Sequence, residues 1–209
     1  MTPTTTSTAK TDLSRRSLLA GLAMGAVLLA LPKGAFALTN QEASNLVAQA
    51  VAEINRVIAS GKPEAAMFRD FSALLGRYAD VNVMARSALG PAARQASSAQ
   101  MAAFTQAFQD YLGRKYGRQF REFIGGSVEV VSTKQLKSFY EVQATARLRG
   151  KDPMDVRFQV SDRSGANKFF NIVVEGVNLL ATERTEIGAM LDNRRGNIDA
   201  TIADLKKAG

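Results

Sequence analysis

Apolar side chains recur every three or four positions from residue 39 to residue 124, which is the spacing of one face of an α-helix. Thr39 and Glu42 are spaced as a capping box at the start of the first run, and Ser60-Gly61 stops it. This half therefore predicts four helices, which begin at Thr39, Pro63, Asp80 and Ser97 or Ser98, the last continuing to Ile124.

From residue 127 the period of the pattern changes from helical to two. The alternation is strict in Tyr140–Arg149, where every second side chain is apolar, and a second alternating run covers Asp155–Val160. With Ser127–Thr133 as a first strand and Phe169–Val174 as a last one, the runs predict a four-stranded antiparallel meander.

The last of these strands has large apolar side chains on both faces. Strict alternation would place Phe169 and Val173 on one face and Phe170, Ile172 and Val174 on the other. A surface strand would instead alternate apolar with polar residues, so both faces of this strand are expected to be covered.

Two helices are predicted after the strands. Glu175-Gly176 breaks the apolar run, and Leu180, Arg184, Ile187 and Leu191 then follow a helical spacing, with a final helix around Ile202. Helices followed by strands, without βαβ alternation, indicate an α+β fold in which helices pack on the sheet.

Composition excludes several kinds of chemistry. The 209 residues contain no His and no Cys, which removes imidazole acid–base catalysis, thiol chemistry and disulfides, and most zinc sites. Gly125-Gly126 follows a helix and precedes a strand, the reverse of the order that a phosphate-binding loop requires. We therefore predict no catalytic residues, no metal and no cofactor.

Residues 1–37 have the features of a cleaved signal peptide, which leaves residues 38–209 as a single domain. Arg15-Arg16 precedes the apolar run Leu18–Leu31, and Ala35-Phe36-Ala37 is an A-x-A cleavage site. The segment Ser14–Gly21 is typical of a twin-arginine export signal. A retained membrane anchor is the alternative, but fourteen helical residues rise only about 21 Å, less than the hydrocarbon core of about 30 Å.

The formal net charge of +8 suits anionic partners, either lipid phosphates or acidic protein surfaces. Arg114, Arg118 and Arg121 lie on one stripe of the long predicted helix, with Lys115 beside it. This stripe is either a docking surface for an acidic partner or simply a solvated face. Nothing in the sequence indicates a nucleic-acid partner.

Three segments, in the same order, resemble the MlaC or Ttg2D family, also called the toluene-tolerance family: Met84–Gly90, Ala107–Gly117 and Glu175–Leu191. The likeness spans residues 68–205. It implies a periplasmic phospholipid carrier, not an enzyme, that shuttles lipid between an outer-membrane lipoprotein complex and an inner-membrane ABC transporter with an MCE-domain ring. A similar branch is associated with hopanoids. The family often has Asp where Asn171 stands and Ser where Asn178 stands.

The resemblance also implies that apolar faces of the helices and the sheet enclose a lipid cavity; without it, the same faces would be ordinary core. Arg184, inside an apolar stripe, would then meet a lipid phosphate at the cavity mouth, or otherwise pair with Glu183 or Glu186 or extend to solvent. The predicted lipid-binding residues are Leu74, Tyr78, Met84, Phe104, Phe108, Leu112, Tyr116, Val142, Phe158, Phe170, Ile172, Val174, Val177, Leu180, Arg184 and Ile187.

Three alternatives stay open from the sequence. The cargo is a hopanoid or another isoprenoid lipid; or the protein is a periplasmic adaptor whose cleft receives a partner helix; or it is an enzyme that uses Asp, Glu or Tyr in the same cavity. A bound lipid, a bound peptide or turnover of a bound lipid would distinguish them.

Overall fold

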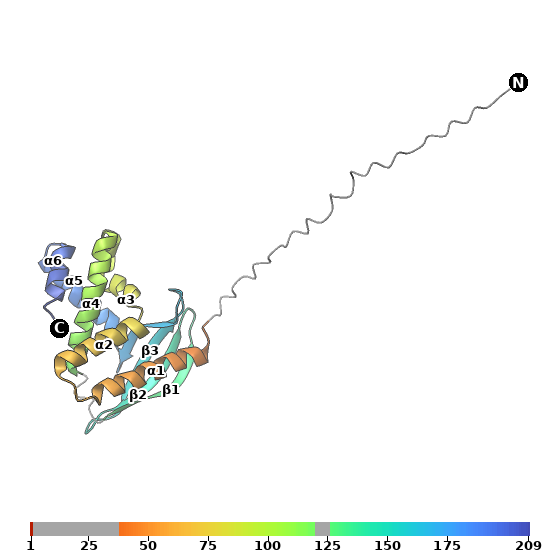
Figure 1. Cartoon of the computed structure of the whole chain (residues 1–209), viewed down its shortest axis with the longest axis vertical. Coiled ribbons are helices and arrows are strands. Elements are labelled where there is room, and N and C mark those ends of the chain that lie inside the picture. Colours follow the sequence, from red (N-terminus) through yellow and green to blue (C-terminus); the bar gives the residue numbers. More distant parts are fainter. Residues whose placement is uncertain (2–37, 120–125) are drawn as a thin grey trace, which may run out of the picture. The chain divides into compact units, whose positions relative to one another are not determined.

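Helices come first and a single antiparallel sheet follows, as the periodicity predicts, which confirms the α+β class (Figure 1). The computed structural model describes Met1, residues 38–119 and residues 126–209. The chain divides into two units, Met1–Phe36 and Ala37–Gly209, and every element belongs to the second. Residues 2–37 of the predicted signal peptide lie outside the described residues. The elements are α1 (Asn40–Ile58), α2 (Glu64–Tyr78), α3 (Val81–Leu89), the 3-10 helix η1 (Gly90–Arg94), α4 (Ser98–Gln119), β1 (Ser127–Gln135), β2 (Tyr140–Arg147), β3 (Met154–Ser161), β4 (Lys168–Val174), β5 (Val177–Asn178), α5 (Leu179–Asn193) and α6 (Ile198–Leu205).

Side-chain caps fix the helix starts that the sequence predicts. The Glu42 N–H donates to Thr39 Oγ1 at 3.2 Å while the Thr39 N–H donates to Glu42 Oε2 at 2.8 Å, so the capping box of α1 is complete. Asp80 accepts from the Val83 N–H in the same way at the start of α3. Of the two candidate serines before α4, Ser97 accepts from the Gln100 N–H. Residues 120–124 of the predicted long helix lie outside the described residues.

The sheet has one strand more than the predicted meander. Its order is β1-β2-β3-β4-β5, and every neighbouring pair is antiparallel. Glu175-Gly176 does not lead directly into a helix, as the sequence analysis assumed, because both residues have positive φ, 49° and 79°. Two such residues form the type of tight turn that reverses a strand. Val177 and Asn178 therefore pair back onto Val174 and Val173 before α5 begins.

A β-bulge changes which side chains of β4 share a face. Val160 pairs with Phe169 and Gln159 pairs with Asn171, so Phe170 is an extra residue with no partner on β3. An inserted residue shifts the alternation by one. The predicted grouping of Phe170 with Ile172 and Val174 was therefore wrong, and it is Phe169 that lies on the face of the sheet shared with these two residues.

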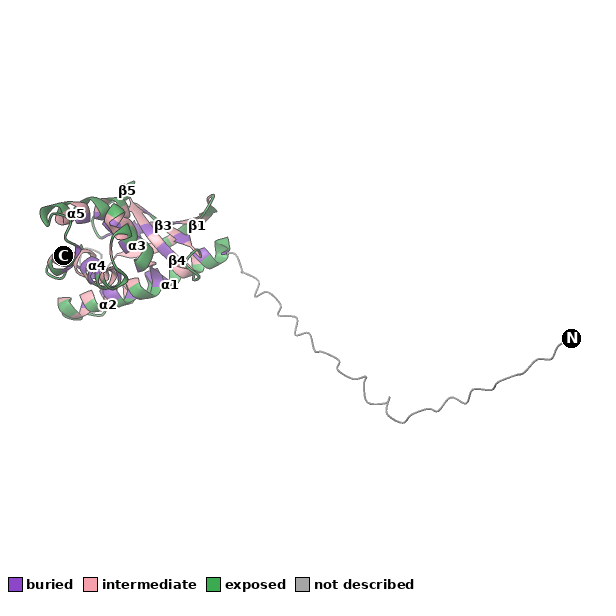
Figure 2. Ribbon diagram, turned by 90° about the horizontal axis from the view of Figure 1, so that it is seen from above, coloured by how far each residue is buried: buried purple, intermediate pink, exposed green. Residues whose placement is uncertain are grey.

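The helices cover one face of the sheet and leave the other to solvent. Helix α1 lies along β1 and β2, and α2 packs on α4. Close approach of α2 to α4 requires glycine, since a Cβ on Gly117 would lie 2.6 Å from the Phe68 ring. Buried residues (purple in Figure 2) lie on the sides of helices and strands that face one another. Within the described residues, no helix is long and apolar enough to span a membrane.

Candidate functional site

A cavity of about 590 Å³ lies between the covered face of the sheet and helices α1, α2, α4 and α5. Twenty-seven described residues line it, and only two of them are charged, Lys151 and Glu183. The volume is within the range of roughly 300–1,000 Å³ that is usual for ligand sites. The shape and lining therefore suit a mainly hydrocarbon ligand with few polar groups.

The floor of the cavity is the inner face of β2, β3 and β4. Val156 pairs with Val174, and Phe158 pairs with Ile172, so both pairs present their side chains on this face. The Phe158 and Phe169 rings meet edge to face, with their centroids 5.7 Å apart. Because of the bulge, Phe169 takes the place on this face that strict alternation would give to Phe170, and it faces the cavity together with Ile172 and Val174.

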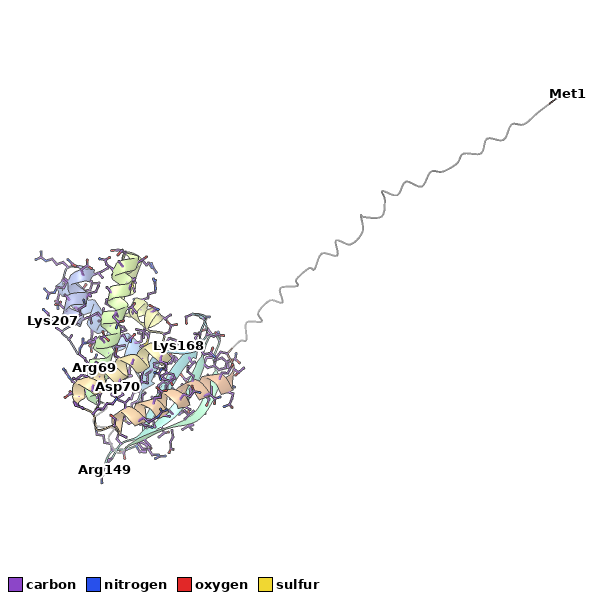
Figure 3. All side chains as sticks on the ribbon, in the orientation of Figure 1. Met1, Arg69, Asp70, Arg149, Lys168 and Lys207 are labelled. Carbon is purple, nitrogen blue, oxygen red and sulfur yellow. The ribbon has the colours of Figure 1, made fainter. Side chains whose placement is uncertain are left out.

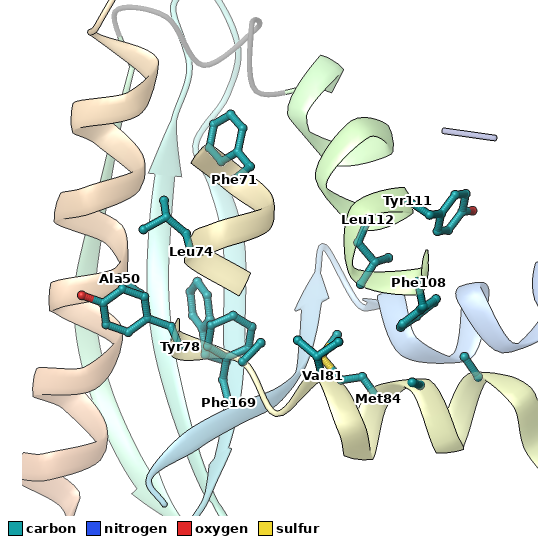
Figure 4. Packing of buried hydrophobic residues seen from close by; sticks show 14 of the residues in the cluster. Ala50, Phe71, Leu74, Tyr78, Val81, Met84, Phe108, Tyr111, Leu112 and Phe169 are labelled. Atoms are coloured by element: carbon teal, nitrogen blue, oxygen red, sulfur yellow. The ribbon is translucent and has the colours of Figure 1, made fainter. Parts of the chain in front are cut away.

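Helices α1 and α2 form an apolar wall opposite the floor. Phe71, Leu74 and Tyr78 of α2 line the cavity, and the Tyr78 ring extends toward α1 (Figure 4). The Tyr78 hydroxyl donates to Glu53 Oε1 of α1 at 2.8 Å. Burial together with this hydrogen bond raises the pKa of Tyr78 above its ordinary value. The phenol therefore remains neutral at physiological pH and ties α2 to α1.

We place the mouth of the cavity at its exposed lining residues, which are Gln119 at the end of α4, Lys151 in the β2–β3 turn and Val177 of β5. The β4–β5 turn is held to β3 because the Glu175 N–H donates to the Asp155 carbonyl at 2.9 Å. Figure 3 labels Arg149 at the tip of the β2–β3 turn. Lys151 is thus the one basic side chain among the described lining residues, and it is exposed to solvent.

One wall of the cavity, between α4 and α5, is polar. Lys115 of α4 lies 2.7 Å from Glu183 Oε1 and 2.7 Å from Glu186 Oε2, both on α5. The Tyr116 hydroxyl donates to Glu183 Oε1 at 2.5 Å, and the Tyr111 hydroxyl donates to Glu186 Oε2 at 2.8 Å. These five residues are called the α4–α5 cluster below.

Burial and charge perturb the pKa values of this cluster. Burial raises the pKa of Tyr111 and of Tyr116, and their carboxylate partners raise it further. For Lys115, burial works to lower the pKa, but hydrogen bonds to Glu183 and Glu186 outweigh it and the pKa is raised. For Glu186, burial works to raise the pKa, but hydrogen bonds from Lys115 and Tyr111 outweigh it and the pKa is lowered. At neutral pH both phenols are therefore protonated, Lys115 is cationic and Glu186 is anionic.

A buried amide holds the start of α5 on the sheet. Asn171 is 3% exposed, and its Oδ1 accepts from the Ile172 N–H and from the Leu180 N–H. Its Nδ2 donates to Gln159 Oε1 at 3.1 Å. Asn178, the other departure from the family pattern, caps α5 by accepting from the Ala181 N–H. Both asparagines therefore serve to position α5 beside the cavity.

Ten of the sixteen residues predicted to bind lipid line the cavity. They come from α2, α3, α4, α5 and the sheet, so the fold gathers side chains that are up to 106 positions apart in the chain. Their contact with lipid remains a prediction. The ten are Leu74, Tyr78, Met84, Leu112, Tyr116, Phe158, Ile172, Val174, Val177 and Leu180.

The other six predicted residues do not line the cavity. Four are fully buried in the core: Phe104, Phe108, Val142 and Ile187. Phe170, the bulge residue, packs edge to face on Phe139 at 5.6 Å. Arg184 is exposed and its guanidinium lies against Gly90, so it is not at the mouth, and the carboxylates expected to pair with it contact Lys115 instead.

Helical spacing misassigned the cavity face of α5. The predicted stripe ran through Leu180, Arg184 and Ile187, whereas the face that lines the cavity carries Leu179, Leu180 and Glu183. Glu183 lies three positions after Leu180, but a carboxylate is not a usual choice for an apolar wall. Sequence reasoning also missed Lys151 because it is in a turn. Further lining residues outside the predicted set are Ala50, Val51, Ile54, Phe71, Leu75, Gly117, Gln119, Val128, Ala146, Leu148, Met154, Val156, Phe169 and Asn171.

The predicted partner-binding residues do not form one free basic stripe. Arg114 donates to the carbonyls of Leu205 and Ala208 at the end of α6, and Lys115 belongs to the α4–α5 cluster. Arg118 is 59% exposed and lies 3.9 Å from Glu64. Arg121 lies outside the described residues. Of the described members, only Arg118 therefore presents a mainly exposed guanidinium.

Comparison with known proteins gives both a family and a solved relative. A family model described as "MlaC protein" matches residues 46–207. A solved structure of a phospholipid-binding protein from Ralstonia solanacearum, in complex with a phospholipid, superposes with a TM-score of 0.68 at 18% sequence identity. The match covers 79% of this chain and 95% of that chain. At this identity the superposition shows a shared fold.

Proposed function

The chain belongs to the MlaC protein family, and we propose that it is a periplasmic carrier that holds the acyl chains of a phospholipid in the apolar cavity. The observation that carries the proposal is the cavity itself, with about 590 Å³ of space and only one cation, Lys151, among its described lining residues. The relative from Ralstonia solanacearum, which was solved with a phospholipid, supports the same assignment.

The energy of lipid transfer explains why a carrier needs such a cavity. A diacyl lipid with about 30 methylenes would lose on the order of 20 kcal/mol in passing from a bilayer into water, at about 0.8 kcal/mol per methylene. An apolar cavity replaces one hydrocarbon environment with another, so the transfer free energy is close to zero. The lipid can then move to the protein or away from it without an energy source in the carrier.

The two charged lining residues orient the proposed ligand. Lys151 is exposed at the mouth, where a phosphate can contact it without leaving water. Glu183 is 1% exposed on the cavity wall, and a carboxylate disfavours a phosphate beside it. The acyl chains therefore lie inside with the headgroup at the mouth. Because the exposed Lys151 suits an anionic headgroup, the site favours a phospholipid over a neutral hopanoid or isoprenoid.

No reaction is part of the proposal. Tyr111 and Tyr116 are held protonated at neutral pH and are therefore not nucleophiles, and the sequence contains no His or Cys to activate one. Delivery to and from membrane complexes follows from the family resemblance: an outer-membrane lipoprotein complex and an inner-membrane ABC transporter with an MCE-domain ring. Reversal of charge in Arg118→Glu should weaken association with such a complex at low salt, and unchanged association would remove Arg118 from the interface.

Export through the twin-arginine route completes the proposed pathway. It rests on Arg15-Arg16 and on the apolar run that follows. Replacing both arginines with Lys should leave the precursor in the cytoplasm, as fractionation of cells would detect. Normal export of the wild-type precursor in cells without the twin-arginine translocase would contradict this route.

The experiment for lipid binding compares two neighbouring positions on β4. Val174 lines the cavity. Val173, which pairs with Arg157 of β3, does not line it. Val174→Trp should occupy space that acyl chains need and should purify with little or no lipid. Val173→Trp should retain lipid at the wild-type level. Native mass spectrometry without detergent, followed by lipid extraction, measures both.

Three outcomes of this experiment would contradict the proposal. Wild-type protein that carries no lipid but binds a peptide would favour an adaptor. Isoprenoid lipid in the extract would change the cargo class. Full lipid occupancy in Val174→Trp would mean that acyl chains do not occupy this part of the cavity.

A further inference from the structure

The α4–α5 cluster joins two helices across the wall of the cavity. All four hydrogen bonds that the structure describes between α4 and α5 belong to this cluster. Tyr116 and Glu183 are both lining residues, so the contact between them forms part of the wall itself. Elsewhere the cavity is bounded by paired strands and by the apolar side chains of α1 and α2. The cluster thus supplies every hydrogen bond that the structure describes across the α4–α5 side of the wall.

The cluster is incompletely balanced. Lys115 is one cation shared by two carboxylates, those of Glu183 and Glu186. Glu183 Oε2 is buried and has no hydrogen-bond partner among the described residues. An unsatisfied buried acceptor loses its hydration without compensation, which lowers the net stabilisation that the cluster gives. Separation of α4 from α5 would return this oxygen to water.

The two helices are held firmly on their other sides. Helix α4 is tied to α2, where Ser72 Oγ donates to Asp110 Oδ1 at 2.6 Å and Gln109 donates to the Ser72 carbonyl. Helix α5 is tied at its start by Asn171, and its far end is joined to α6 by Arg194 and Asp204. The cluster can therefore break while both helices keep their other contacts.

We propose that the α4–α5 cluster is a latch on a side opening of the cavity, through which the acyl chains of the bound lipid enter and leave. The inference rests on the proposed lipid binding. If lipid entered only at the mouth, each acyl chain would have to pass Lys151 and Val177 with its methyl end first. Much of the acyl chain would then be in water during entry. A slot between α4 and α5 lets the chains pass sideways and keeps them against apolar surface, which avoids about 0.8 kcal/mol for each exposed methylene.

The first test removes a hydroxyl that donates to a carboxylate, once in the latch and once away from the cavity. Tyr116→Phe removes the hydroxyl bound to Glu183 in the latch, whereas Ser72→Ala removes the hydroxyl bound to Asp110 between α2 and α4, and neither Ser72 nor Asp110 lines the cavity. Protein loaded with pyrene-labelled phosphatidylglycerol is mixed with unlabelled phosphatidylglycerol vesicles, and the release rate is measured. Release should be at least threefold faster for Tyr116→Phe and should stay at the wild-type rate for Ser72→Ala.

The second test closes the opening covalently. Because the sequence has no Cys, Lys115→Cys with Glu186→Cys can be joined selectively by a bismaleimide whose spacer contains a reducible disulfide. Release should be fast before cross-linking, at least tenfold slower after it, and fast again after reduction. The control joins Arg194→Cys to Asp204→Cys, which bridges α5 to α6 away from the cavity and should leave release unchanged.

The outcomes separate the latch from lipid carriage. Release from loaded protein that is unaffected by the cross-link between positions 115 and 186, or equal rates for Tyr116→Phe and Ser72→Ala, would overturn the latch alone. Wild-type protein that takes up no labelled lipid would overturn the proposed function and the latch with it.

Discussion

Two walls of the same cavity are stabilised by different kinds of interaction. The wall formed by the sheet with α1 and α2 consists of apolar side chains such as Phe71, Phe158 and Ile172. The wall between α4 and α5 includes Tyr116 and Glu183, joined by hydrogen bonds and backed by Lys115. Apolar contacts are non-directional and change gradually with distance, whereas buried ionic contacts depend on geometry and fail when one partner is lost. The first wall therefore gives the cavity its shape, and the second gives it a part that can open.

The largest expected effect is on the polar wall, in Lys115→Met. Removing the cation leaves Glu183 buried without its ionic partner, and loss of one member of a buried pair costs about 4 kcal/mol of unfolding free energy. Denaturant unfolding of lipid-free protein measures the loss. Arg194→Met is the matched control, because it breaks an ion pair at the surface and should change stability little. Equal effects of the two substitutions would mean that the cluster is no more than a surface network.

The next effect distinguishes cavity from core on a single helix. Ile187 is fully buried and does not line the cavity, so Ile187→Ala should cost about 3 kcal/mol of unfolding free energy in lipid-free protein. Leu180, two turns earlier on α5, borders empty space, and Leu180→Ala should cost less than about 1 kcal/mol. Similar costs at both positions would show that the space beside Leu180 is filled in solution.

The smallest expected effect is the pH dependence of the polar wall. The lowered pKa of Glu186 adds stability above its ordinary value of 4.5, and this stability is lost as pH falls through the folded-state pKa. The raised pKa of Lys115 adds stability below 10.5, which is lost as pH rises through the folded-state value; Tyr111 and Tyr116 act in the same direction. Glu183 on α5 also contacts Lys115 and Tyr116. The contribution of the cluster to the free energy of unfolding should thus be constant from about pH 5 to 10.

The comparison of wild type with Lys115→Met isolates this dependence from other titrating groups. The difference in unfolding free energy between the two proteins should shrink above pH 10.5, because the stability that the Lys115 cation adds is lost there. A difference that grows with alkaline pH would contradict the assignment of a stabilised lysine cation in the cluster.

The same contrast explains what could be predicted from the sequence. Local rules were sufficient for the helix starts, because Thr39, Asp80 and Ser97 each accept from a backbone N–H three residues away. The period of two was sufficient for β2, where Val142 and Ala146 are buried and Arg147 is exposed. Both signals are encoded by neighbouring residues.

Features that depend on distant partners were not predictable in this way. The bulge at Phe170 is set by the pairing of β4 with β3, so nothing within β4 shows that Phe169 shares a face with Ile172. Glu183 was interpreted as a neighbour for Arg184, yet its partner Lys115 is 68 positions away and on another helix. The helices and strands of the apolar wall were therefore predictable, although many of its lining residues, such as Phe71 and Val156, were not among the predicted ones. The contacts of the polar wall required the tertiary structure.

The apolar lining of the cavity also determines how loading should respond to temperature. Burial of apolar surface from water gives a large negative heat-capacity change, and the affinity then varies steeply with temperature. A lipid that moves from a bilayer into this cavity exchanges one hydrocarbon surrounding for another, so its heat-capacity change should be small. The partition of lipid between carrier and membrane should then vary little between a cold and a warm environment. Net movement would accordingly be decided by the membranes and complexes at each end of the journey, with the carrier itself neutral to direction.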